Sequence, residues 1–167
     1  MGESKTPLVI AISGTKNTGK TTLLTKLIPL LRQRGVRVAA IKHDHHGFDI
    51  DLPGTDSYRL REAGAMGVAI YSEGQYAVIR RQAHPDIEQM LAHFSDMDLV
   101  LLEGGKHTSY PKIEIVRKAV SISPVCQADT LIGLCTDCSL SLPGVPRYTL
   151  EDYDGMAQLI MDALKMN

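Results

Sequence analysis

The run from Gly14 to Thr21 constrains the fold of this chain more than any other feature. Its letters fit the pattern G-x-x-x-x-G-K-[ST], in which backbone amides cradle the phosphates of a nucleotide. An apolar run precedes it at residues 8–12, and an amphipathic helical pattern follows it. A strand, a glycine turn and a helix N-terminus in this order direct several N–H groups and a positive dipole end at one anion. The sequence therefore predicts a loop that binds a nucleoside triphosphate.

Each position of this loop has a physical task. Gly14 and Gly19 allow backbone geometry and close approach that a Cβ would obstruct. Lys20 reaches the β- and γ-phosphates, and the Thr21 hydroxyl can ligate Mg²⁺. The alternative, a glycine-rich turn with a chance lysine, is disfavoured because pattern and context agree. We also expect contact with the nucleotide from the other residues of the run and the one after it, which are Thr15, Lys16, Asn17, Thr18 and Thr22.

With 167 residues, 44% of them hydrophobic and 22% charged, the chain has the composition of an ordinary globular protein. We interpret residues 1–167 as a single nucleotide-binding domain, because no repeat, low-complexity tract or linker divides them. The formal net charge of −1 predicts neither a nucleic-acid nor a membrane surface. No apolar stretch approaches the roughly 20 residues that span a bilayer, and residues 1–6 lack a signal-peptide core. We therefore expect a cytoplasmic protein.

Strand and helix patterns alternate along the chain. We expect strands at 8–12, 36–41, 99–102, 113–116 and 131–135, and a hairpin from 68–71 and 76–79. We expect helices at 21–34, 56–65, 85–94 and 156–164. This order predicts an α/β domain of the P-loop NTPase class, with a mostly parallel, doubly wound sheet flanked by helices. Residues 113–116 alternate in polarity and so are expected nearer an edge. Ligands of such sheets lie beyond the carboxyl ends of the strands, here after Ile12, Ile41, Leu102 and Cys135.

Two carboxylates follow these strands. Asp44 is the first candidate to complete the Mg²⁺ shell, directly or through water. Glu103 ends an apolar strand before two glycines, where an acid can hold Mg²⁺ or orient a water; capping or a salt bridge is its alternative role. With Lys20, these acids form the predicted catalytic set. Alternatively, His43, His45 and His46 of this stretch could bind a transition metal.

Asp137 follows the strand at 131–135, where a carboxylate can accept hydrogen bonds from N1–H and the 2-amino group of guanine. A turn or capping role for Asp137 is equally plausible. Cys135 and Cys138 are spaced C-x-x-C, which fits a redox pair or half a zinc site. We favour a structural role for them, because no second cysteine or histidine pair follows and small buried residues are common in such strands.

Several motifs together resemble the molybdopterin-guanine dinucleotide biosynthesis protein B (MobB) family. They are, besides the phosphate loop, the runs 42–46 (KHDHH), 49–58 (DIDLPGTDSY), 61–65 (REAGA), 102–106 (LEGGK) and 112–113 (KI). The similarity extends from about Pro7 to Asp137.

This resemblance implies a GTP-binding protein with Mg²⁺ and weak GTPase activity that acts in molybdenum cofactor biosynthesis. Such proteins assist the guanylyltransferase that attaches GMP to molybdopterin, and they form homodimers. Lys16 resembles an extra lysine that in some P-loop proteins acts across a dimer. By the same resemblance, contacts with the pterin phosphate, a second ligand or the partner enzyme fall to His45, His46, Asp49, Asp51, Asp56, Ser57, Arg61 and Lys106.

Two other functions are open. The first is an ATP-dependent small-molecule kinase, although Arg80-Arg81 is the only arginine pair and does not lie in a long lid-like loop. The second is a nucleotide-gated metallochaperone that uses the loop His43–His46. For the leading function, neither an arginine finger nor a water-orienting glutamine is evident. We therefore expect hydrolysis slower than about one per second without a partner.

Overall fold

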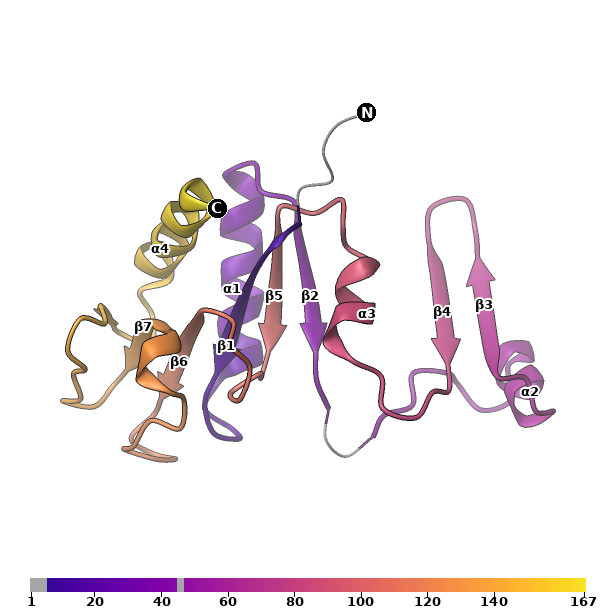
Figure 1. The fold of residues 1–167 in the computed structure, drawn as a ribbon. Coiled ribbons are helices and arrows are strands. Elements are labelled where there is room, and N and C mark those ends of the chain that lie inside the picture. Colours follow the sequence, from indigo (N-terminus) through magenta and orange to yellow (C-terminus); the bar gives the residue numbers. More distant parts are fainter. Residues whose placement is uncertain (1–5, 45–46) are drawn as a thin grey trace. The chain divides into compact units, whose positions relative to one another are not determined.

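The computed structural model describes residues 6–44 and 47–167 (Figure 1). Residue contacts divide the chain into two compact units, and the single nucleotide-binding domain expected over residues 1–167 stays a prediction. The first unit contains the residues up to His43 and those from Met90 to Asn167, and the second contains Asp44–Gln89. Because the second unit interrupts the first without a glycine- or proline-rich linker, composition alone does not mark the division.

The first unit is built on a six-stranded sheet with the order β2-β5-β1-β6-β7-β8, in which every neighbouring pair is parallel. The predicted mostly parallel α/β sheet is thereby confirmed. The two-residue strand β8 and a short 3-10 turn, η1, were not expected. In chain order the elements are β1 (Leu8–Ser13), α1 (Lys20–Gln33), β2 (Val38–Lys42), β5 (Leu99–Glu103), β6 (Lys112–Val116), η1 (Ala128–Thr130), β7 (Leu131–Thr136), β8 (Arg147–Tyr148) and α4 (Tyr153–Met166).

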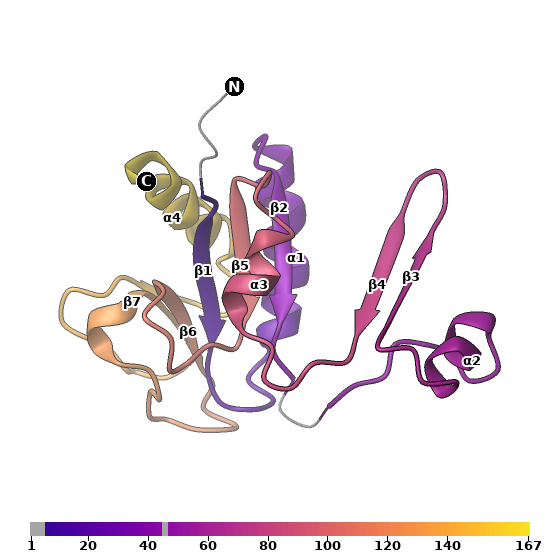
Figure 2. The ribbon, with the colours of Figure 1, turned by 45° about the vertical axis from the view of Figure 1, so that its right-hand side comes forward.

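Helices α1 and α4 cover one face of this sheet (Figure 2). Helix α1 forms because leucines recur at helical spacing and bury one side against the strands, and Gly35, at a φ of +85°, follows its end. Pro29 lies inside the helix. Residues of α1, α4 and the central strands share one core, including Leu27, Ile10 and Ile160 with no exposed surface. The loop that follows β1 therefore starts from a rigid base.

Strand β6 corrects one expectation. Its polar alternation predicts an edge position, but β6 lies between β1 and β7 and all five of its residues are buried. Lys112 donates from Nζ to the carbonyls of Thr108 and Tyr110, and Glu114 accepts from the backbone N–H of Val125 at 2.6 Å. Burial lowers the pKa of Lys112. The polar residues of β6 thus anchor neighbouring loops rather than face solvent.

The second unit contains a short helix and a hairpin, α2 (Asp56–Glu62), β3 (Gly67–Tyr71) and β4 (Tyr76–Arg80). Thr55 caps α2 by accepting a hydrogen bond from the Tyr58 N–H. The helix ends earlier than its predicted limit at residue 65, because Gly64 adopts a φ of +102°. Strands β3 and β4 pair antiparallel, as the hairpin pattern predicts.

Helix α3 (Ile87–Ala92) begins in the second unit and leads back to β5. Asp86 accepts a hydrogen bond from the Gln89 N–H at 2.9 Å and so stabilises the first turn. None of the helices formed by residues 6–44 and 47–167 has the length and apolar character that a bilayer crossing requires.

Candidate nucleotide-binding site

The loop between β1 and α1 is shaped by two glycines with left-handed backbones. Gly14 has a φ of +137°, and a Cβ at this position would lie 2.4 Å from the backbone oxygen of Ile115. Gly19 has a φ of +100° and directly precedes the helix. The loop therefore runs against β6, and its course depends on the absence of a side chain at Gly14.

Lys20 lies over this loop. Its Nζ donates to the carbonyl oxygens of Gly14 at 3.2 Å and Thr15 at 2.7 Å, and Thr18 Oγ1 donates to the same Thr15 oxygen at 3.0 Å. Partial burial lowers the pKa of Lys20, while the nearby carboxylate of Glu103 raises it. These hydrogen bonds hold the ammonium group of Lys20 against the loop that precedes α1, and helix N-termini are common anion-binding sites.

Glu103 meets Thr21 at the carboxyl edge of the sheet. The Thr21 hydroxyl donates to Glu103 Oε1 at 2.9 Å, and Lys42 Nζ lies 3.5 Å from the same oxygen. Gly104 forms two hydrogen bonds with β1. Its N–H donates to the carbonyl oxygen of Ile12, and its own carbonyl oxygen accepts from the Ser13 hydroxyl. The structure thus brings together two oxygen ligands of the kind that Mg²⁺ prefers.

The backbone N–H of His43 donates to the carbonyl oxygen of Glu103 at 3.4 Å, so the segment of the predicted histidine ligands begins next to this pair. Asp44 is the first residue of the second unit, and its role in the Mg²⁺ shell stays a prediction. His45 and His46 lie outside the described residues. Among the parts of the chain that the structure describes, no group of three or more His, Cys, Asp or Glu side chains is arranged to hold a metal ion.

Four residues predicted to meet a second ligand or partner form an ion-pair network within the second unit. Arg61, only 8% exposed, donates to both oxygens of Asp49 at 3.1 and 3.2 Å. Its Nη1 also lies 3.8 Å from Asp51, whose other oxygen accepts from Ser57 Oγ at 2.9 Å. Asp56 is exposed at the start of α2, and Lys106 belongs to the first unit. The charge of Arg61 is therefore largely matched inside this network.

We expect Arg61→Gln to raise the pKa of Asp49 toward the ordinary aspartate value. In the native protein the hydrogen bonds from Arg61 lower that pKa, so the pair stabilises the second unit at a pH above about 4. This contribution is lost as the pH falls through the lowered pKa of Asp49. Carboxyl NMR titration measures the change, and Arg59→Gln, on the exposed side of the same helix, should leave Asp49 unaffected.

Asp137 joins the ends of two strands. Its Oδ1 accepts from the backbone N–H of Lys118 at 2.6 Å, and this hydrogen bond lowers the pKa of Asp137. The turn after β6 is thereby fixed to the end of β7. Direct contact between Asp137 and guanine stays a prediction.

The three cysteines are free, and two of them are poor nucleophiles. Burial raises the pKa of Cys126 to about 11 and that of Cys135 to about 12. We expect iodoacetamide at pH 8 to alkylate both at least roughly 100-fold more slowly in the native than in the unfolded protein, because only the thiolate reacts. Peptide mass spectrometry over a time course measures these rates. Fast labelling of Cys135 would instead favour a redox or metal-transfer role.

Sequence reasoning missed Glu151, and it left Arg117 open between a contact with a phosphorylated second ligand and ordinary surface charge. Together with Thr18, Gly19 and Tyr153 they line a cleft of about 120 Å³ beside the phosphate loop. Arg117 directly follows β6, so the signal was present: a basic residue at the carboxyl end of a parallel strand.

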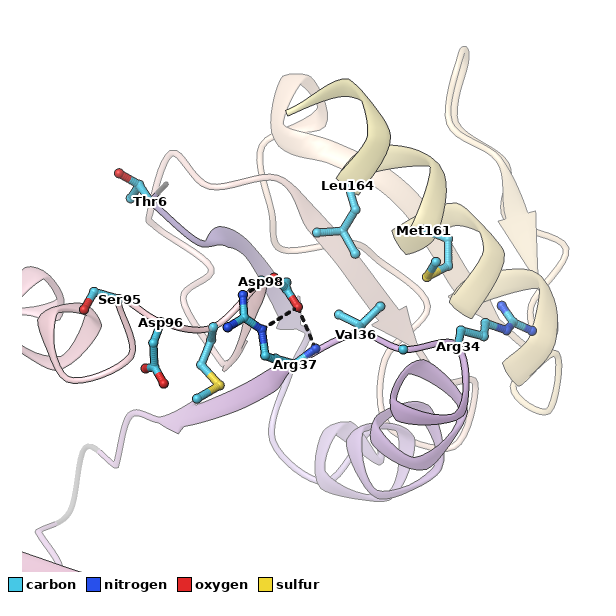
Figure 3. A pocket seen from close by; sticks show the side chains of 11 residues that line it. Thr6, Arg34, Val36, Arg37, Ser95, Asp96, Asp98, Met161 and Leu164 are labelled. Carbon is cyan, nitrogen blue, oxygen red and sulfur yellow. Dashed lines mark hydrogen bonds and ion pairs between the residues drawn. The ribbon is translucent and has the colours of Figure 1, made fainter. Parts of the chain in front are cut away.

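A larger hollow of about 550 Å³ lies where β1, β2 and β5 begin (Figure 3). Arg37 spans part of it and pairs with Asp98, with Nη2 2.7 Å from Oδ1 and Nε 3.1 Å from Oδ2. Met161 and Leu164 of α4 form another part of its wall. Parallel α/β sheets bind ligands at the opposite, carboxyl edge. The smaller cleft beside Gly19 therefore belongs to the candidate site, and this hollow does not.

The glycine loop, the parallel sheet and the convergence of Thr21 with Glu103 define a protein of the P-loop NTPase fold. Sequence comparison then identifies its family. Residues 9–137 match the family described as Molybdopterin guanine dinucleotide synthesis protein B, and the chain belongs to this MobB family.

Individual relatives agree with this assignment. A molybdopterin-guanine dinucleotide biosynthesis adapter protein of Escherichia coli (strain K12) is 36% identical over 170 residues, covering 96% of this chain and 95% of the relative. An adapter protein of the same description from Haemophilus influenzae is 38% identical over 127 residues, covering 74% and 71%. A crystal structure of molybdopterin-guanine biosynthesis protein B matches with a TM-score of 0.74 and 28% identity, covering 95% and 99%.

Proposed function

We propose that this chain binds GTP with Mg²⁺ at residues 14–22 and acts as an adapter in the biosynthesis of the molybdopterin guanine dinucleotide cofactor. The observation that carries the proposal is the placement of Lys20, Thr21 and Glu103 around one glycine loop. Membership of the MobB family supports the biosynthetic role.

In this function each group has a distinct task. The amides of the loop and Lys20 bind the phosphates, and Thr21 with Glu103 binds Mg²⁺, which neutralises charge on the terminal phosphates. Glu103 is 13% exposed and accepts a hydrogen bond from the Thr21 hydroxyl, which supports a role beside the metal, and the sequence offers neither an evident arginine finger nor a water-orienting glutamine. We therefore expect GTP hydrolysis to be slow in the absence of a partner.

We also propose that the chain forms a homodimer through the hairpin of β3 and β4. Tyr71, Tyr76 and Val78 are 57–85% exposed and share one face of the hairpin, and Ile70 is exposed on the other. A two-stranded hairpin is marginally stable alone in water, so covering these apolar faces would stabilise it. Sedimentation equilibrium distinguishes a dimer, which supports the proposal, from a monomer, which contradicts it.

Isothermal titration with GTP and ATP, each with Mg²⁺, tests the nucleotide assignment. Tighter binding of GTP supports it, and tighter binding of ATP favours a kinase. If GTP binds, adding the guanylyltransferase and molybdopterin tests the adapter role through the rate of dinucleotide formation. An unchanged rate in the presence of the chain would refute that role. Copurification of stoichiometric transition metal would instead favour the metallochaperone.

A further inference from the structure

The cleft beside the phosphate loop has one wall from each of three segments. Thr18 and Gly19 belong to the loop, Arg117 follows β6, and Glu151 and Tyr153 come from the segment at the start of α4. The guanidinium of Arg117 is close to the loop, since its Nη1 lies 3.8 Å from the position of a Cβ built on Gly19. The cleft is thus continuous with the surface that binds phosphate in the proposed function.

The direction of the bound nucleotide follows from the strand order. Glu103 reaches Thr21 from β5, on one side of β1, and this pair belongs with the terminal phosphates and Mg²⁺. Arg117 approaches the loop from β6, on the other side of β1. A nucleotide that extends across the loop from the metal therefore places its sugar and base on the side of Arg117.

The cleft holds one positive and one negative side chain that have no direct partner among the described residues. The side chains of Arg117 and Glu151 form no hydrogen bond or ion pair within residues 6–44 and 47–167, although Arg117 contributes to lowering the pKa of Asp137. A planar guanidinium stacks on aromatic rings, and a carboxylate accepts from N–H and O–H donors. A nucleoside supplies both an aromatic ring and such donors.

We propose that this cleft receives the nucleoside of the bound nucleotide, with Arg117 against the base and sugar on one side and Glu151 accepting hydrogen bonds on the other. Asp137 acts as a positioning residue for Arg117, because its hydrogen bond to the Lys118 N–H holds the turn on which Arg117 stands. This inference rests on the proposed binding of a nucleotide at the loop, and it adds residues outside the phosphate-binding motif.

The test compares GTP with inorganic tripolyphosphate, which has the phosphates but no nucleoside. Arg117→Ala should weaken GTP binding about tenfold and leave tripolyphosphate binding unchanged. Arg117→Lys, which keeps the charge but loses the planar group, should recover only part of the loss, and Glu151→Gln should weaken GTP binding selectively. Lys118→Ala is the control, because it removes the neighbouring charge without lining the cleft.

Three results separate this inference from the proposed function. Equal weakening of GTP and tripolyphosphate by Arg117→Ala would place Arg117 on the phosphates and overturn the inference. Unchanged GTP binding in both the Arg117→Ala and Glu151→Gln variants would also overturn it. If the wild-type chain binds neither compound, the nucleotide assignment itself fails. Melting temperatures equal to wild type show that the variants, which change exposed residues, remain folded.

Discussion

Replacing Lys20 with alanine is expected to weaken the binding of GTP about 100-fold or more. The variant loses a charge-assisted contact with the phosphates, and such contacts contribute about 1.5–3 kcal/mol each. A tenfold change corresponds to about 1.4 kcal/mol, so loss of two such contacts accounts for the expected effect. Titration of wild type and variant with GTP and Mg²⁺ measures the ratio of dissociation constants.

Lys26→Ala is the matched control for this experiment, because Lys26 is an exposed lysine of the same helix. It should bind GTP as wild type does, and both variants should keep the wild-type circular dichroism spectrum. Equal affinities of Lys20→Ala and wild type would refute the assignment of residues 14–21 as the phosphate loop.

Gly14→Ala is expected to impair both folding stability and nucleotide binding. A left-handed φ costs a residue with a Cβ roughly 1–2 kcal/mol, and here the new atom also lies 2.4 Å from the Ile115 carbonyl oxygen. That neighbour is backbone in the buried strand β6, so it cannot swing aside as a flexible side chain would. We expect the loop to move away from β6, with a loss of GTP affinity and a lower melting temperature.

Gly35→Ala separates the cost of the positive φ from the cost of the clash with the Ile115 carbonyl oxygen. Gly35 has a φ of +85°, yet no atom lies within 4 Å of a Cβ built there. Its replacement should show the backbone cost alone and leave GTP binding intact. Thermal unfolding of the two variants, followed by titration with GTP, makes the comparison. If Gly14→Ala is as stable as Gly35→Ala and binds GTP normally, close packing against Ile115 does not shape the site.

The parallel fold and the centre of the site follow from local patterns. The phosphate loop is a contiguous motif, and Glu103 ends an apolar strand. Because the carboxyl ends of parallel strands lie at one edge of the sheet, Glu103 is expected near the loop. The place of strand β6 in the sheet is harder to predict, because alternating polar residues give the same sequence pattern whether they face water or anchor buried loops. Only the bonds of Lys112 and Glu114 distinguish these cases, and they join residues whose proximity depends on the fold.

For the segment between β2 and β5, the sequence does not show which charged side chains pair with one another. By resemblance to the MobB family, its charged residues are predicted to contact a second ligand or a partner, and this stays a prediction. In the structure Arg61 pairs with Asp49, twelve residues away along the chain, and has little exposed surface. A sequence shows that opposite charges are available, but their mutual pairing depends on how Asp49 and the helix α2 come together.

Strand β5 lies between β1 and β2, and this position affects how the protein folds during its synthesis. Thr21 and Glu103 are 82 residues apart along the chain, and Ser13 and Gly104 are 91 apart. A chain growing from its amino end therefore carries the whole glycine loop long before its acidic neighbour exists. Pairings over such separations form slowly, because the intervening chain loses entropy when it closes. Ability to bind nucleotide should thus arise late and abruptly during synthesis, when β5 inserts between its neighbours.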